Sequence, residues 1–132
     1  MPERVQMAFN ALTEGVLILD ARSRIVLTND SFTKLRPGDD TRLTGRRPAE
    51  IEWLCASLAD TQTYPWTQAM NERTQVIGIG VEIPQLGGVP ARKAIMNCAP
   101  ILDGGSSVRG CLITYDDVTA LDHANSELLR SR

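Results

Sequence analysis

The sequence predicts one α+β domain, with a five-stranded antiparallel sheet, helices on one face of the sheet, and a flanking helix at each end. Five short runs are rich in apolar and β-branched residues, as strands are. Short polar turns join the first two runs and also the last three, as in hairpins. Segments with helical periodicity lie between these groups and at both ends, an order typical of this fold class.

The composition limits the function classes. The 132 residues are enough for one substantial core. A net charge of −2 gives no electrostatic reason to expect a nucleic-acid partner. No apolar run approaches the roughly 18 residues of a membrane span, so we expect a cytoplasmic protein with no membrane segment in this stretch. The three cysteines lack CxxC spacing, which argues against a disulfide scaffold and against a metal site.

The chain begins with a predicted amphipathic helix over residues 3–13, which Gly15 ends. Its apolar positions recur at helical spacing, at Val5, Ala8, Phe9 and Leu12. Residues 15–20 and 25–29 are predicted to form two strands. A polar turn over 21–24 joins them as a hairpin.

Short helices are predicted after this hairpin. Residues 30–31 can cap a helix over 32–35. Pro48 suits the first turn of a second helix, whose apolar side carries Ile51, Leu54, Cys55 and Leu58. A third helix is predicted over 66–73, with Pro65 at its start.

Three more strands are predicted over residues 75–83, 91–102 and 108–115. In the first of them, strict alternation would place four side chains on one face: Ile77, Ile79, Val81 and Ile83. A glycine-rich turn over 103–107 joins the last two strands, so these two are expected to pair as neighbours.

The last strand is followed directly by a polar helix. After Asp116 and Asp117 the pattern changes from that of a strand to that of a helix. A buried strand joined to an exiting helix can pass a change in the core to something outside it. We therefore divide the chain into an N-terminal flanking helix over 1–14, a domain over 15–118, and the start of a C-terminal signalling helix over 119–132.

Several local motifs, taken together and in order, resemble those of a PAS domain. Residues 14–32, EGVLILDARSRIVLTNDSF, are similar to the opening hairpin of that family. Residues 43–46 resemble its Leu-x-Gly-Arg, and residues 99–110 its last hairpin. Residues 117–119 match its closing Asp-(Ile/Val)-Thr, whereas residues 60–75 match poorly.

The resemblance implies a sensory or dimerisation module of a larger signalling protein. It implies a homodimer and a covalently linked effector, such as a sensor histidine kinase of a two-component system or a GGDEF diguanylate cyclase. A transcriptional regulator and a ligand-free dimerisation scaffold are the alternatives. The chain has no Gly-x-Ser-x-Gly, no P-loop and no histidine near a nucleophile, so we expect no catalytic activity in this stretch.

Three residues at the end of the last strand are candidates for signal relay: Asp117, Val118 and Thr119. Thr119 can cap the exit helix, with Asp122 at the capping-box position. The resemblance implies an ion pair between Asp117 and a basic residue on the sheet, for which Arg92 is the candidate. The alternative is an ordinary helix cap, worth about 1 kcal/mol.

A ligand pocket is the second candidate site. By alternation, inward faces of the last strands and the helices above them could line an apolar cavity for a small-molecule ligand. The candidates are Trp53, Trp66, Met70, Ile79, Met96, Cys98, Cys111, Ile113 and Tyr115. The alternative is that these side chains simply fill the core. Cys98 and Cys111 would share a face, either as a redox-sensitive pair or as small buried hydrophobes.

The cofactor stays unknown. Haem-binding relatives use a histidine on a helix beside the pocket, and residues 65–73 contain none. Flavin photosensors of the family use a cysteine in an Asn-Cys-Arg run, which is absent, and Asn97-Cys98 lies in the wrong element. The sequence therefore argues against haem and flavin, and we expect the single histidine, His123, to be exposed to solvent.

Apolar residues near both ends of the chain are candidates for a dimer interface. Val5, Phe9 and Leu12 of the first helix could pack against the outer sheet face of a partner. Leu121 and Leu128 lie on one face of the exit helix and could begin a two-helix seam. The alternative is that the exit helix packs back on its own domain.

Overall fold

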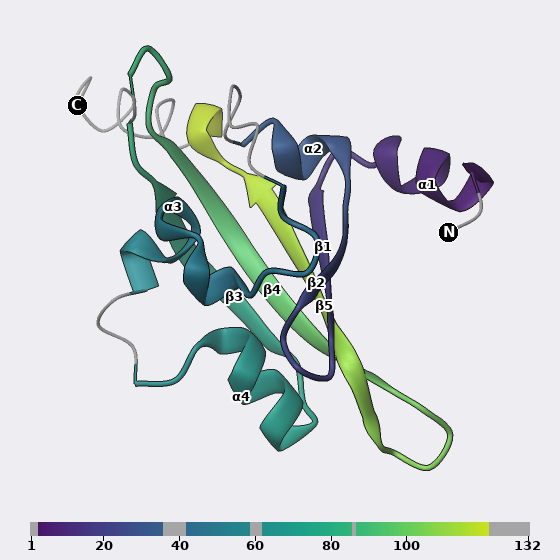
Figure 1. Cartoon of the computed structure of the whole chain (residues 1–132). Helices are drawn as coiled ribbons and strands as arrows, with labels where there is room; N and C mark the ends of the chain where they lie inside the picture. The colour runs from purple at the N-terminus through teal and green to yellow at the C-terminus, as the bar shows by residue number, and fades with distance from the viewer. Residues whose placement is uncertain (1–2, 36–41, 59–61, 86, 122–132) are drawn as a thin grey trace.

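The chain forms an open five-stranded antiparallel sheet with the strand order β2-β1-β5-β4-β3 (Figure 1). The structure, a computed structural model, describes residues 3–35, 42–58, 62–85 and 87–121. The strands are β1 (Gly15–Asp20), β2 (Ile25–Thr28), β3 (Val76–Ile83), β4 (Arg92–Leu102) and β5 (Val108–Asp117).

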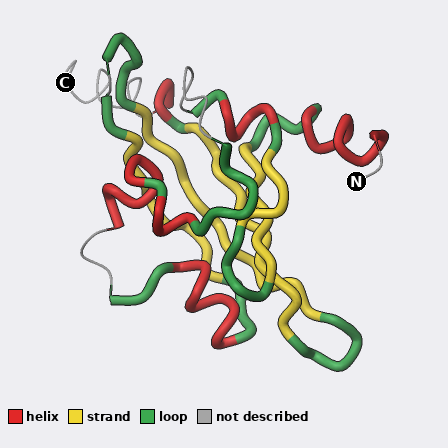
Figure 2. Tube along the Cα trace, in the orientation of Figure 1, coloured by secondary structure: helices red, strands yellow, loops and turns green. Residues whose placement is uncertain are grey.

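Short helices lie before the first strand and between the second and third strands of the chain. They are α1 (Glu3–Asn10), α2 (Asp30–Thr33), the 3₁₀ turn η1 (Pro48–Glu50), α3 (Glu52–Cys55), the 3₁₀ turn η2 (Ala56–Leu58) and α4 (Pro65–Glu72). Figure 2 shows α3 and α4 gathered over one side of the strands, with α1 apart from them at the N-terminal end. The predicted fold class, a five-stranded antiparallel sheet with helices, is confirmed.

The last strand, β5, lies at the centre of the sheet. It pairs with β1 on one side and with β4 on the other, so that Tyr115 lies opposite both Gly15 and Met96. Its inward side chains are buried beneath the helices, and they are Cys111, Ile113 and Tyr115. A structural change in the core would therefore act directly on the central strand of the sheet and not on an edge strand.

The side chain of Asn29 joins three segments of the chain. Its Oδ1 accepts hydrogen bonds from the backbone N–H groups of Val16 and Phe32, at 2.8 and 3.0 Å. Its Nδ2 donates to the carbonyl oxygens of Phe9 and Glu14, at 2.8 and 3.0 Å. Asn29 is buried, and these bonds hold the end of α1, the start of β1 and the start of α2 together.

Several element boundaries differ from those the sequence predicted. The helix α1 ends at Asn10, before the predicted end at residue 13. Asn29 caps α2, so the cap predicted at residues 30–31 is wrong. The single helix predicted from Pro48 is divided into η1, α3 and η2, because Ile51 between the first two has an extended backbone, with φ −101° and ψ 104°.

The strand β3 contains a bulge that the strict alternation did not predict. The register with β4 shifts between Val76 and Ile79, and Gly78 in the bulge has a φ of 74°. Glycine adopts this left-handed conformation without steric cost. As a result Val76 and Ile79 pack against the core, whereas Ile77, which was predicted to share a face with Ile79, is 68% exposed.

Candidate functional site

The nine predicted pocket residues come together in the core. Trp66 and Met70 come from α4, and the other buried members come from β4 and β5. Seven of the nine are buried: Trp66, Met70, Met96, Cys98, Cys111, Ile113 and Tyr115. The remaining two, Trp53 and Ile79, are partly buried and pack against the same cluster. The nine side chains pack against one another between the sheet and the helices, and their role as a ligand pocket stays a prediction.

Tyr115 brings a polar group into this apolar cluster. The residue is 1% exposed, and its ring packs against that of Phe32, with the ring centroids 5.4 Å apart. Its hydroxyl has no hydrogen-bond partner. Burial raises the pKa of Tyr115 well above its ordinary value, so the group is a neutral hydroxyl that can donate one hydrogen bond.

The three cysteines are free thiols. Cys98 lies opposite Ile113, and Cys111 lies opposite Pro100, so the two cysteines share a face as diagonal neighbours. A hydrogen bond with Cys111, together with burial, raises the pKa of Cys98. Burial raises the pKa of Cys55 to about 11. A thiol must lose its proton to react readily, and a raised pKa keeps Cys55 and Cys98 protonated. These two cysteines therefore behave as small hydrophobic residues.

The three relay candidates lie where β5 passes into a helix. Asp117 Oδ2 forms the expected ion pair with Arg92 Nη1 at 3.0 Å. Asp117 Oδ1 accepts the backbone N–H of Thr119 at 3.0 Å and its hydroxyl at 2.6 Å. Partial burial alone would raise the pKa of Asp117, but the hydrogen bonds from Thr119 and Arg92 outweigh it and hold the pKa below its ordinary value.

Thr119 also binds this junction to the neighbouring strand β4. Its Oγ1 accepts the backbone N–H of Lys93 at 2.9 Å, and the N–H of Val118 donates to the carbonyl oxygen of Lys93 at 2.9 Å. The helical backbone begins at Thr119, and Asp122, its predicted capping-box partner, lies outside the described residues. The bonds to Lys93 are long-range contacts that the sequence did not predict.

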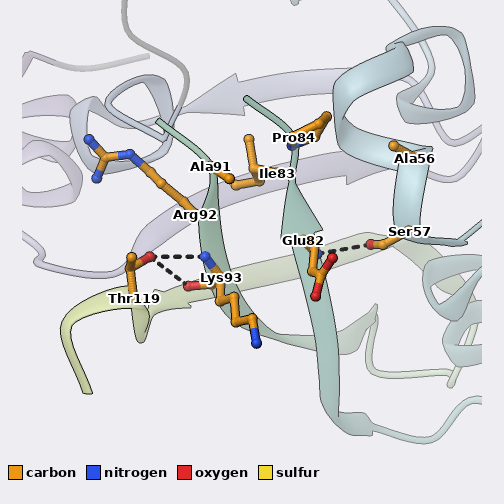
Figure 3. Close-up of a pocket in the computed structure, with 9 residues that line it drawn as sticks. All are labelled: Ala56, Ser57, Glu82, Ile83, Pro84, Ala91, Arg92, Lys93 and Thr119. Carbon is orange, nitrogen blue, oxygen red and sulfur yellow. Dashed lines mark hydrogen bonds between the residues drawn. The ribbon is translucent and has the colours of Figure 1, made fainter. Parts of the chain in front are cut away.

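A pocket of about 300 Å³ lies beside this junction. Figure 3 shows Thr119 reaching Lys93 on one side of the β3–β4 pair and Ser57 reaching Glu82 on the other. The lining residues are Ala56, Ser57, Glu82, Ile83, Pro84, Ala91, Arg92, Lys93 and Thr119. None of these except Arg92 and Thr119 was a candidate from sequence, because the pocket is formed by segments that are far apart in the chain.

Four of the five residues predicted to form a dimer interface are among the described residues. Val5, Leu12 and Leu121 are 40%, 47% and 60% exposed, and Phe9 is half-buried. Leu128 and His123 lie outside the described residues. The helix α1 has no buried residue, so its apolar side is available to a partner.

Two features, a membrane-spanning helix and a metal-binding cluster, are not found in the described part of the chain. Within the described ranges, no helix is both long enough and apolar enough to cross a bilayer. The same residues contain no group of three or more His, Cys, Asp or Glu side chains placed to hold a metal ion.

Comparison with known proteins points to one family. A family profile described as the PAS fold matches residues 9–123. No curated protein sequence matches the chain. The structure of an RNA-binding Light-Oxygen-Voltage receptor matches with a TM-score of 0.72 at 16% identity, and the match covers 98% of this chain and 36% of that one.

Two structures of VqmA are similar as well. The phage VqmA–DPO complex matches with a TM-score of 0.69 at 17% identity, covering 97% of this chain and 57% of that one. The Vibrio cholerae VqmA dimer, described in the absence of its target DNA, matches with a TM-score of 0.69 at 18% identity, covering 92% and 53%. The chain thus spans between about a third and three fifths of the length of these proteins, and the likeness concerns the fold.

Proposed function

Because this chain belongs to the PAS fold family, we propose that it relays a signal through β5 and the helix that follows to an effector in a larger protein. The observation that carries the proposal is the position of β5. It is the central strand, its inward side chains lie in the core, and it runs directly into helical backbone at Thr119. One continuous segment therefore joins the interior to the exit helix.

The hydrogen bonds at the junction support this relay. Asp117 and Thr119 bond to each other, to Arg92 and to the backbone of Lys93, so the start of the helix is fixed to β5 and to its neighbour β4. A displacement of β4 against β5 would change these bonds together. A ligand can drive such a change only if it binds the two arrangements with different affinity.

The interior is the proposed place of sensing. A small, largely apolar molecule with a hydrogen-bond acceptor would suit the core cluster, because the Tyr115 hydroxyl is a buried donor without a partner. The phage VqmA, a protein of similar fold, is described in complex with DPO.

A thermal-shift screen of the purified chain, with mass spectrometry of co-purifying molecules, tests the sensing role. We expect a molecule that raises the melting temperature of the wild type and raises it less in Tyr115→Phe. Tyr64→Phe is the matched control, because Tyr64 is only half-buried and its ring stacks on Trp66 at 4.8 Å. If no molecule stabilises the chain and none co-purifies, the ligand-free scaffold is the better account.

The effector is proposed to be a diguanylate cyclase or a histidine kinase, on the resemblance of the residues after Asp116 to the linkers of those proteins. A transcriptional regulator is the alternative, and it is supported by the similarity to the Vibrio cholerae VqmA dimer, which is described in connection with the DNA-binding mechanisms of LuxR-type receptors. The gene sequence downstream of codon 132 distinguishes them. A Gly-Gly-Asp/Glu-Glu-Phe motif indicates a cyclase, a phosphoacceptor-histidine helix indicates a kinase, and a DNA-binding domain indicates the regulator.

A further inference from the structure

The pocket beside the junction has mostly apolar walls. Ile83 is the last residue of β3 and Pro84 follows it, Ala91 precedes β4, and Ala56 belongs to η2. Figure 3 shows Ile83 and Ala91 between the Arg92 side chain and the turn that carries Ala56. The volume of the pocket, about 300 Å³, is at the lower end of the range for small-molecule sites. This place at the end of the β3–β4 pair is distinct from the core cluster around Tyr115.

The charges around the pocket balance. Arg92 is paired with Asp117 at 3.0 Å. Glu82 and Lys93 lie opposite each other in the register of β3 and β4, and both line the pocket. A charged ligand would therefore lose its hydration without meeting a net opposite charge, so the surroundings favour an uncharged molecule.

Two donors remain for such a molecule. The Ser57 Oγ accepts the backbone N–H of Glu82 at 3.0 Å, which leaves its own proton to donate. The Nε of Arg92 is buried and has no hydrogen-bond partner. An unpartnered buried donor is costly, by about 1–3 kcal/mol, and an acceptor atom on a ligand would remove that cost.

We propose that this pocket binds an uncharged small molecule with an apolar body and a carbonyl-type acceptor. The apolar body contacts Ile83, Pro84 and Ala91, the acceptor takes a hydrogen bond from Ser57, and the buried Nε of Arg92 is a second donor available to it. Because Thr119 and the backbone of Lys93 line the same pocket, the bound molecule touches the bonds that fix the exit helix. Binding itself is independent of the proposed function, and only its effect on the exit helix rests on that function.

The test uses three probes of nearly the same shape: 2-phenylacetamide, phenylacetate and phenethylammonium. Each is titrated into the ¹⁵N-labelled chain, and amide chemical shifts are followed by NMR. We expect 2-phenylacetamide to cause saturable shifts at Ser57, Lys93 and Thr119, and to bind more tightly than either charged probe.

Ala91→Phe should weaken the binding of 2-phenylacetamide at least about tenfold, because the ring occupies the pocket. Ala21→Phe is the matched control, since Ala21 is also exposed but lies in the β1–β2 turn, and it should leave the affinity unchanged. The ring of Ala91→Phe could turn into solvent and leave the pocket open, so a second variant is needed. Ser57→Ala removes a hydrogen-bond donor and should weaken the binding of 2-phenylacetamide severalfold.

The proposal is overturned if none of the three probes causes saturable shifts at these amides, or if a charged probe binds most tightly. Shifts confined to Ile113 and Tyr115 would also overturn it, and would place the ligand in the core. None of these results bears on whether β5 and the exit helix are coupled, which amide exchange at the junction measures separately.

Discussion

Tyr115 carries a polar hydroxyl group into the core, where the rest of its side chain packs as an apolar ring. Its ring packs against Phe32, and the residue lies in the middle of the apolar cluster. A buried hydroxyl without a hydrogen-bond partner destabilises the folded state by about 1–3 kcal/mol, because it has lost its hydration without replacement. A phenylalanine would fill the same space at no such cost.

Tyr115→Phe should therefore raise the free energy of unfolding, by about 1 kcal/mol. Urea denaturation followed by circular dichroism measures the change. A variant that is less stable than the wild type would show that the hydroxyl makes a favourable interaction in the folded protein, and the proposed role as a spare donor would then be wrong.

Asn29 shows what sequence could and could not predict at this scale. The motif around it was recognised, and so was a helix start in this place. The cap was assigned to residues 30–31, because a pattern of local spacing favours a Ser or Asp before the first apolar residue. The two bonds from Nδ2 to Phe9 and Glu14 reach back along the chain and could not be deduced from the residues near Asn29.

Among the elements, β5 and its neighbours followed the predictions most closely. Strand alternation and the turn at residues 103–107 were sufficient to pair β4 with β5. In β3 the same rule failed, because a bulge at Gly78 shifts the alternation and turns Ile77 to solvent. A period of two cannot reveal where an extra residue is inserted. The pocket beside Thr119 was missed for a related reason, since η2, β3 and β4 meet there only in three dimensions.

The ion pair at the end of β5 has a defined pH dependence. The pKa of Asp117 is lower in the folded chain than its ordinary value of 3.8. A carboxylate of this kind contributes stability that is fully present above the unfolded pKa and is lost as the pH falls through the folded pKa. Because the side chain is about a third exposed, we expect this contribution to be less than about 1 kcal/mol.

Asp117→Asn should therefore reduce stability at neutral pH and flatten its fall below about pH 5, since the variant has no carboxylate to protonate at this position. Urea titrations at a series of pH values between neutrality and the acid limit of folding measure both effects. The neighbouring exposed Asp116 provides the control, because Asp116→Asn should keep the steeper acid dependence of the wild type. Equal slopes in all three proteins would mean that the Arg92–Asp117 pair contributes nothing in solution.

At the scale of the whole molecule, the exposed apolar residues of α1 are the basis for a proposed homodimer. Val5 of α1 and Leu12, which follows the helix, are exposed, and α1 buries none of its side chains in its own domain. Removing apolar surface from water is the main favourable term in association, so such a helix has a reason to find a partner. The Vibrio cholerae VqmA of similar fold is described as a dimer.

A chain shortened to residues 14–132 should sediment as a monomer at concentrations where the full chain is a dimer. The double substitution Val5→Ser and Leu12→Ser should have the same effect without shortening the chain. Ile77→Ser is the control, because Ile77 is more exposed than either residue but lies on the edge strand β3. Dimerisation that is unchanged in both altered chains would exclude α1 from the interface.

The most direct measurement of the relay is amide hydrogen exchange at Val118 and Thr119, followed by NMR. Their N–H groups donate to Lys93 O and Asp117 Oδ1. We predict that both amides are protected in the wild type and in Asp116→Ala, and that Asp117→Ala increases the exchange rate of Thr119 at least about tenfold. If both amides exchange freely in the wild type, and Asp117→Ala changes neither, the exit helix begins independently of β5 and the relay is contradicted.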